Sequence, residues 1–322
     1  ACADQGPPEE RIYRQAMGIT LQGMIDWAAR YAEVADAAAV RATDPVMRDA
    51  HRRVAAACRR VPAQPARDLF EGLQAIVLIH LALHIEGHGL SVSIGLPDRA
   101  LAPFIDEAAD IDDMTDLVAA FLLKINANSI FGRGSKTQAI TVGGVDHRGV
   151  DQCNALTHAF LSACDLVRAG DPHLFVRWHP HIDPAVKRRA LDMLAAGVSM
   201  PLLINDAPTV QGFIEAGVTE ADAWDYCVIG CNELGIPGRA SESATATSGT
   251  IQYLALLNDV LLAHPDPDAI ADMGRLLDLL EDRMADHALT TRERGQAHRR
   301  RVAAEMPMPF TSALMRHGIA RG

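Results

Sequence analysis

The sequence feature that most constrains the fold is a short apolar run that ends at a glycine followed by a cysteine. Residues 226–235 read Tyr-Cys-Val-Ile-Gly-Cys-Asn-Glu-Leu-Gly, and Pro237 and Gly238 follow shortly after. The apolar run predicts a buried strand that ends at Gly230, and the glycines and the proline predict a loop beyond it. Catalytic groups of α/β proteins tend to lie where a buried strand gives way to a loop. This stretch is therefore our candidate active site.

The spacing of Cys231 and Glu233 indicates which chemistry this site suits. Residues i and i+2 of an extended segment point to the same side, so we expect both side chains to face one cavity. A neighbouring carboxylate raises the pKa of a thiol and disfavours the nucleophilic thiolate, and papain-like enzymes place a histidine there instead. A protonated thiol suits hydrogen-atom transfer, with the carboxylate moving a proton. The alternative is a buried structural cysteine beside a loop carboxylate.

A second segment upstream makes the pattern more specific. Residues 201–206 read Pro-Leu-Leu-Ile-Asn-Asp, and residues 230–233 read Gly-Cys-Asn-Glu. The pair resembles the glycyl radical enzymes, the pyruvate formate-lyase-like family, whose cysteine loop reads Gly-Cys-Val-Glu-Pro after an upstream Pro-x-x-x-Asn-Asp. Asn232 and Leu234 depart from that loop, so the eliminase and decarboxylase branches of the family both stay open.

The resemblance runs over nearly the whole chain in one order. It includes Ser-Val-Ser-Ile-Gly at 91–95, Gly-Gly-Val at 143–145 and Pro-Phe-Thr-Ser-Ala-Leu at 309–314. In dehydratase members a histidine and a serine near the first of these segments line the substrate pocket. Leu90 stands where the histidine would be, so Ser91 carries over as a candidate substrate contact, with Asp98 nearby.

Arg177 is a further candidate substrate contact. It ends a predicted strand at 173–177, where its guanidinium is suited to a substrate carboxylate. The alternative is a structural ion pair.

The resemblance implies an α/β fold, namely part of a ten-stranded α/β barrel of the glycyl radical enzyme type, whose halves are antiparallel. The predicted elements agree, because strands alternate with helices. We expect residues 1–322 to form one partial pyruvate formate-lyase-like domain without the N-terminal segment and the C-terminal glycyl radical domain. Open strand edges and an exposed apolar lumen would follow. The strands are predicted at 90–95, 139–142, 173–177 and 226–229, and the helices at 8–36, 44–60, 68–86, 114–126, 151–166, 184–197, 206–217, 250–262 and 265–303.

The implied function is that of a lyase of anaerobic metabolism that cleaves a C–C, C–O or C–N bond of a small organic substrate. Cys231 would act as a thiyl radical and Glu233 as general acid or base. The implied cofactor is a glycyl radical without a metal, installed by a radical S-adenosylmethionine activase.

The residues of this chain do not carry the radical-bearing motif of the family. The Arg-Val pairs that begin at Arg53, Arg60 and Arg301 each lead to alanine where the radical glycine must stand. We therefore expect a chain that is inactive alone, being a truncated gene product, a fragment, or a domain that needs a partner, either a complementary chain or a second copy in a homodimer. The alternative is a non-catalytic remnant or binding subunit of the same fold.

Net charge and cysteine usage indicate which partners and which cellular compartment to expect. The net charge is −11, from 30 Lys and Arg against 41 Asp and Glu, which argues against a nucleic-acid partner. We find no apolar run of membrane-span length and no secretory start. The six cysteines include no CxxC pair, as expected for a reduced, cytoplasmic chain.

Histidines at spacings of four raise the question of a metal. His80, His84 and His88 share one face of a predicted helix, but a zinc-protease motif needs glutamate directly after the first histidine, where Leu81 stands. We expect interior or interface histidines and no metal. A metal hydrolase that uses His80, His84 and the pair at 179 and 181 is the remaining hypothesis.

Overall fold

A three-stranded parallel sheet lies at the centre of the larger part of this chain. The strands are β1 (Ala139–Gly143), β2 (His173–Trp178) and β3 (Leu202–Asn205), in the order β1-β2-β3. Parallel neighbours need a crossover, and each crossover here is a helix. These helices are α6 (Ala155–Val167) and α7 (Pro184–Ala195), and α8 (Asp206–Glu215) follows β3. The predicted α/β alternation is therefore confirmed.

The computed structural model describes residues 7–86, 92–105, 110–127, 137–238 and 252–305. The chain divides into two compact units, of which the first comprises residues 1–240 and 309–322 and the second residues 241–308. Each unit is described by itself.

The segment before β1 only partly forms the strand predicted at 90–95. The backbone N–H of Ile94 donates to the carbonyl of Ala139, and the N–H of Thr141 donates to the carbonyl of Gly95, each at 2.9 Å. This pairing is a single parallel bridge to β1. Residues 90 and 91 lie outside the described ranges.

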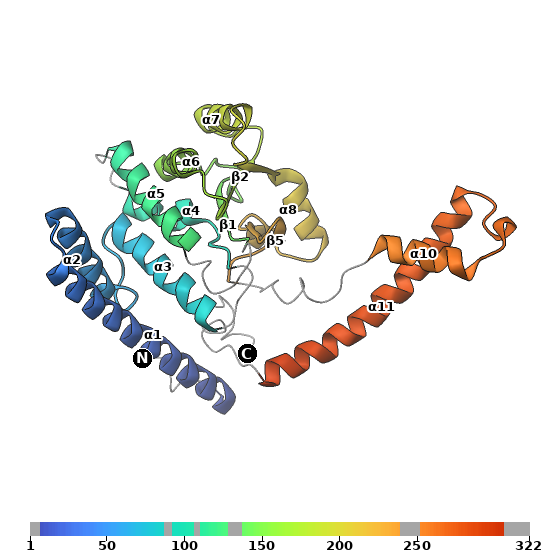
Figure 1. Cartoon of the computed structure of the whole chain (residues 1–322), viewed down its shortest axis with the longest axis horizontal. Coiled ribbons are helices and arrows are strands. Elements are labelled where there is room, and N and C mark those ends of the chain that lie inside the picture. The colour runs from blue at the N-terminus through green and yellow to red at the C-terminus, as the bar shows by residue number, and fades with distance from the viewer. Residues whose placement is uncertain (1–6, 87–91, 106–109, 128–136, 239–251, 306–322) are drawn as a thin grey trace. The chain divides into compact units, whose positions relative to one another are not determined.

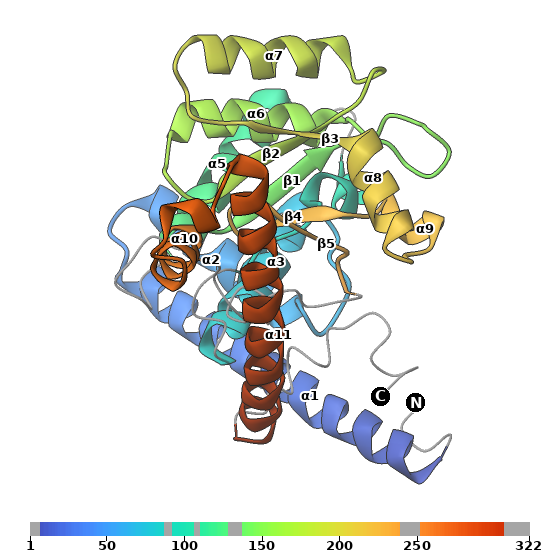
Figure 2. The same ribbon diagram turned by 90° about the vertical axis from the view of Figure 1, so that its right-hand side faces the viewer.

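The two faces of the sheet are covered by different structures. Side chains alternate along a strand, so Ile140, Val142, Leu174 and Val176 point to one face, where they join the main core with α5 (Ile111–Ala127) and α6. The other face is covered by an antiparallel hairpin of β4 (Cys227–Ile229) and β5 (Glu233–Gly235). Figure 2 shows this order, with α7 and α6 on one side of the sheet and the hairpin on the other.

The N-terminal helices form a smaller core. They are α1 (Pro8–Arg41), α2 (Pro45–Arg60) and α3 (Leu69–Glu86), and α1 and α2 pack lengthwise (Figure 1). The Asp44 carboxylate caps α2 by accepting a hydrogen bond from the N–H of Val46. Between α3 and α5 lie the short helices α4 (Pro97–Ala100) and η1 (Ala102–Phe104), and α9 (Glu220–Ala223) precedes the hairpin.

Helix α3 corrects one expectation. It is long and apolar enough to cross a membrane by length and composition, with a mean hydropathy of 1.4, so the expectation of no such run is wrong. Half of the helix is buried inside the protein. The buried residues include His80 and His84, and these features are those of a core helix.

The second unit is helical in its described part. It contains α10 (Tyr253–Ala263), η4 (Pro267–Ala269) and α11 (Met273–Glu305). Leu256 and Val260 of α10 are buried, and α10 packs on α11. The helices predicted at 250–262 and 265–303 are thus present with shifted ends.

Candidate functional site

The predicted strand at 226–229 is confirmed as β4, and Cys231 lies on the turn that joins it to β5. Residues 230–232 form this turn, and Ile229 pairs with Glu233 across the hairpin. Gly230 has φ +62°, a conformation that glycine adopts at little cost. The assumption that residues 231–233 run extended is therefore wrong.

Cys231 and Glu233 are both exposed. The Cys231 thiol donates to the Thr137 hydroxyl over 3.6 Å, and the Glu233 carboxylate accepts from the Asn232 N–H at 3.1 Å. Exposure excludes the alternative of a buried structural cysteine at 231. Of the two cysteines of this segment, Cys227 is buried, and burial raises the pKa of its thiol to about 12.

Hydroxyl groups connect the hairpin to the sheet. The Val228 N–H donates to Thr141 Oγ1 at 2.9 Å, and the Gly230 N–H donates to Ser93 Oγ at 3.0 Å. Ser93 Oγ also accepts from the Ala139 N–H at 3.1 Å. The middle residue of β4 and the first residue of the turn after it are therefore hydrogen-bonded to groups of the sheet side.

Arg177 lies fully buried beneath the start of the hairpin. Its guanidinium donates to the carbonyls of Trp224 and Tyr226, at 2.8 and 3.3 Å, and to the carbonyl of Val145 at 3.4 Å. Its remaining two bonds go to Asp206, at 2.8 and 3.1 Å. These five bonds match the five N–H donors of an arginine, so its hydrogen-bonding capacity is used inside the protein.

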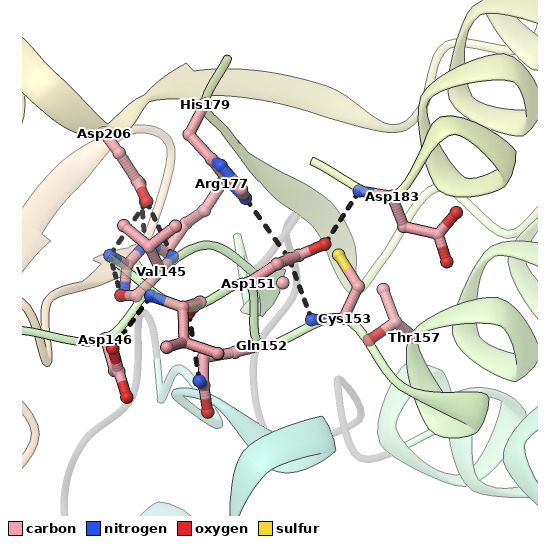
Figure 3. A network of polar contacts seen from close by, with 12 residues as sticks. Val145, Asp146, Asp151, Gln152, Cys153, Thr157, Arg177, His179, Asp183 and Asp206 are labelled. Carbon is pink, nitrogen blue, oxygen red and sulfur yellow. Dashed lines mark hydrogen bonds and ion pairs between the residues drawn. The ribbon is translucent and has the colours of Figure 1, made fainter. Parts of the chain in front are cut away.

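Asp206 completes this network from the first residue of α8. Besides Arg177, its carboxylate accepts from the Tyr226 hydroxyl at 2.6 Å and from the Val145 N–H at 3.1 Å. Figure 3 shows the paired Asp206 and Arg177 side chains beside Val145. Burial raises the pKa of the Tyr226 hydroxyl, which keeps it a hydrogen-bond donor. Of the two expectations for Arg177, a substrate contact or a structural ion pair, the structure shows the ion pair, with Asp206 as its partner.

The turn after β1 lets Arg177 reach this position. Gly144 has φ +82°, and a Cβ there would lie 2.5 Å from Arg177 Nε and 2.9 Å from its Cβ. A side chain at this position would push the guanidinium off its partners. The Gly-Gly-Val motif therefore serves close packing in this chain.

Asp98 is fully buried at the same turn. Its carboxylate accepts from the Gly143 N–H at 2.7 Å, the Thr157 hydroxyl at 2.8 Å and the Arg99 N–H at 2.9 Å. Burial raises the pKa of Asp98 to about 6. Arg99 donates to the Gly143 carbonyl at 2.7 Å, and burial lowers its pKa to about 10. Asp98 thus bonds to the protein itself, and Ser91 lies outside the described residues.

A neighbouring carboxylate, Asp151, holds the ends of two elements (Figure 3). It accepts from the Cys153 N–H at 3.0 Å, the Asp183 N–H at 2.8 Å and the His179 ring at 3.2 Å. His179 is buried, whereas His181 is exposed. Burial and Asp151 both raise the pKa of the Cys153 thiol, so this cysteine is not poised as a thiolate.

The α3 histidines form an interior polar network, as expected. His80 Nε2 donates to the Val92 carbonyl at 3.1 Å, and His84 Nε2 donates to Gln138 Oε1 at 3.0 Å. The Gln138 amide in turn donates to Asp171. Within the described ranges no group of three potential ligands is placed to hold a metal ion, and His88 lies outside them.

Four residues of this site lie in motifs or strands recognised in the sequence but were given no role of their own. They are Ser93, Thr141, Asp206 and Tyr226. One available signal was the polar residue inside an otherwise apolar buried strand, such as Thr141 in β1, because a buried polar group always needs a partner.

Comparison with known proteins shows which proteins the chain as a whole is similar to. The family model described as pyruvate formate lyase-like matches residues 4–322. The (2S)-3-sulfopropanediol dehydratase of Klebsiella oxytoca is 29% identical over 248 residues, which are 72% of this chain and 30% of that protein. The isethionate sulfite-lyase of Nitratidesulfovibrio vulgaris is 29% identical over 287 residues, 83% of this chain and 34% of that protein.

Solved structures show the same fold. The glycerol-bound B12-independent glycerol dehydratase of Clostridium butyricum matches with a TM-score of 0.88 and 20% identity, over 99% of this chain and 43% of that one. A glycyl radical enzyme of Archaeoglobus fulgidus matches with a TM-score of 0.82 and 24% identity, over 97% and 43%. The chain therefore has the α/β fold of part of a glycyl radical enzyme barrel, as predicted. It spans about a third of the length of the curated relatives it matches.

Proposed function

Because this chain belongs to the pyruvate formate lyase-like family, we propose that it carries the cysteine turn of a glycyl radical lyase acting on a small organic substrate. Relatives named as dehydratases and sulfite-lyases support this general type. The observation that carries the proposal is the position of Cys231, exposed on a hairpin turn whose base is bonded to buried side chains.

In this proposal Cys231 is the hydrogen-atom acceptor. A glycyl radical would supply the unpaired electron: the S–H bond of Cys231 would break, its hydrogen atom would pass to the radical carbon, and the sulfur would keep the odd electron. The sulfur then takes a hydrogen atom from a substrate carbon, so that an S–H bond forms, a C–H bond breaks and the odd electron moves to the carbon. The thiol has to point the same way in every turnover, and a rigid supporting element achieves this.

Glu233 is the general acid or base of the proposal. Its exposed carboxylate lies two residues from Cys231, at the start of β5. It would take a proton from the substrate or give one to the leaving group, which in related chemistry contributes about 10²–10⁴-fold to the rate. The guanidinium of Arg177 and the carboxylate of Asp98 are bonded within the protein, so we assign both residues to holding the site rather than to substrate contact.

The radical itself would be stored outside the residues of this chain. Alanine stands at the decisive position after Arg53, Arg60 and Arg301. We infer that turnover needs a glycine-bearing segment or complementary chain and a radical S-adenosylmethionine activase. The alternative expected from the sequence is a binding subunit of this fold that does no chemistry.

Turnover by Cys231 variants tests the proposal. In the complete, activated protein, Cys231→Ala should abolish turnover, and Glu233→Gln should lower kcat by about 10²-fold or more. Asn232→Ala, on the same exposed turn, is the matched control and should stay within about threefold of wild type, since most surface changes are mild. Turnover retained in Cys231→Ala refutes the proposal. Substrate binding without turnover in the activated wild type would instead indicate the binding subunit.

A further inference from the structure

The β4–β5 hairpin lies on the sheet without backbone pairing to it. In the described part of the chain, β4 pairs only with β5, and the three-stranded sheet contains only β1, β2 and β3. Nevertheless β4 packs on β1, and Val228 joins Ala139 and Phe175 in one apolar cluster. Apolar contact is non-directional, so it does not by itself determine where along β1 the hairpin sits.

Two side-chain hydroxyls make directional hydrogen bonds that can fix the position of the hairpin along β1. Val228 lies in β4 and Gly230 directly follows the strand, and the N–H groups of both point to the sheet side. They donate to Thr141 Oγ1 and Ser93 Oγ, at 2.9 and 3.0 Å. The hydroxyls therefore act where the carbonyls of a neighbouring strand would act in a sheet.

Ser93 connects three segments at once. It lies beside the bridge that joins its own segment to β1, and its Oγ accepts from the N–H of Ala139 in β1 as well as from that of Gly230. Movement of the hairpin along β1 breaks the bond to Gly230 while the bond to Ala139 stays. Ser93 thus ties the hairpin to one position of the sheet.

The register of the hairpin decides where the Cys231 thiol lies. Cys231 directly follows Gly230, and its Sγ is 3.6 Å from the hydroxyl of Thr137, which precedes β1. A slip of one residue along a strand turns each side chain to the opposite face. With Thr141 and Ser93 in place, Cys231 is held opposite Thr137.

We propose that Thr141 and Ser93 are positioning residues that set the register of the hairpin on β1 and thereby the place of the Cys231 thiol. The relevance of this to catalysis rests on the proposed function, because it takes Cys231 as the reacting group. The register itself is a property of the folded chain.

Hydrogen exchange and thiol alkylation test the register in the chain as it exists. Thr141→Val removes the hydroxyl with little change of shape, and Thr141→Ser keeps it. In Thr141→Val the Val228 amide should exchange about tenfold faster, as expected for the loss of one hydrogen bond. The rate of Cys231 alkylation by iodoacetamide, followed by peptide mass spectrometry, should change at least threefold, while Thr141→Ser restores both readouts to within about twofold of wild type.

Two further variants keep the test decisive. Ser93→Ala should produce the same pattern at Gly230, and it decides the outcome if Thr141→Val does not fold. Thr20→Val, which removes a hydroxyl bonded to the Ala16 carbonyl in α1, is the matched control and should leave the hairpin readouts unchanged. Unchanged Val228 and Gly230 exchange in both hairpin variants overturns the proposal.

Turnover separates this proposal from the proposed function. In the complete, activated protein, Thr141→Val should lower kcat at least tenfold and change KM by less than about twofold, because it misplaces the thiol without altering substrate contacts. Equal losses in Thr141→Ser and Thr141→Val would contradict a role of the hydroxyl. If Cys231→Ala stays active, the proposed function fails, whereas the exchange results still decide the register.

Discussion

The base and the tip of the β4–β5 hairpin are opposite kinds of environment. At the base, Arg177 and Asp206 form an ion pair whose side chains are 0% and 2% exposed, and Tyr226 is buried beside them. At the tip, a few residues further along the chain, Cys231 and Glu233 are exposed. The groups that hold the hairpin are thus separated from the groups that we propose to react.

The buried ion pair at the base positions the hairpin. Replacing a buried ion pair by apolar residues often leaves stability unchanged or increases it, whereas removing one partner is costly. The pair at the base is therefore not explained by net stability. Its guanidinium bonds to two carbonyls that precede β4, and these bonds specify where the hairpin starts.

Removal of the buried cation at the base should have the largest effect on stability. Arg177→Met leaves the Asp206 carboxylate buried without its partner and should lower the free energy of unfolding by about 3–5 kcal/mol. Urea unfolding followed by circular dichroism measures this. Arg148→Met, which removes an exposed ion pair with Asp146, is the matched control and should leave the midpoint close to wild type. An equal loss of unfolding free energy in Arg177→Met and Arg148→Met would contradict the role of Arg177 as the partner of a buried charge.

A smaller effect should come from the turn that makes room for Arg177. Gly144→Ala puts a Cβ into the guanidinium and forces alanine into a positive φ, which should cost about 2–4 kcal/mol in the same unfolding assay. Gly149→Ala has a similar φ of +76° with nothing within 4 Å of the added Cβ. It should cost only the strain of about 1 kcal/mol. A Gly144→Ala variant no less stable than Gly149→Ala would show that the Arg177 side chain can move away from the added Cβ at little cost.

The smallest effect should be found at the tip. Cys231→Ser and Glu233→Gln change exposed side chains and should leave the free energy of unfolding within about 0.5 kcal/mol of wild type. Thermal unfolding by calorimetry checks this. A loss at the tip as large as that of Arg177→Met would mean that the tip also stabilises the fold, and the division between base and tip would fail.

The helices and strands that were predicted correctly are those with a clear signal in their own residues. The apolar run before Gly230 predicted β4, and the caps and helical periodicity located α2 and α7 close to their observed ends. Short strands escaped the same reasoning. β3 and β5 have four and three residues, too few for a clear alternation, and their pairing depends on partners elsewhere in the chain.

In the candidate site, too, residue types could be recognised from the sequence but their bonding partners could not. Ser91, Asp98 and Arg177 were predicted as substrate contacts, whereas in the structure Asp98 and Arg177 bond within the protein. Ser93, two residues from the predicted serine, holds the hairpin instead. Residue type and spacing indicate that a group is suited to binding, but they do not show which partner it meets.

The α/β alternation, the resemblance to the family and the strand that ends at Gly230 could all be predicted from the amino-acid sequence, because periodicity, glycines and short motifs act over a few neighbouring residues. The pairing of Arg177 with Asp206, 29 positions away, and the bond between Thr141 and Val228, 87 positions away, could be seen only in the folded chain. Such bonds exist only after the sheet and the hairpin have packed together, and their geometry follows from that packing.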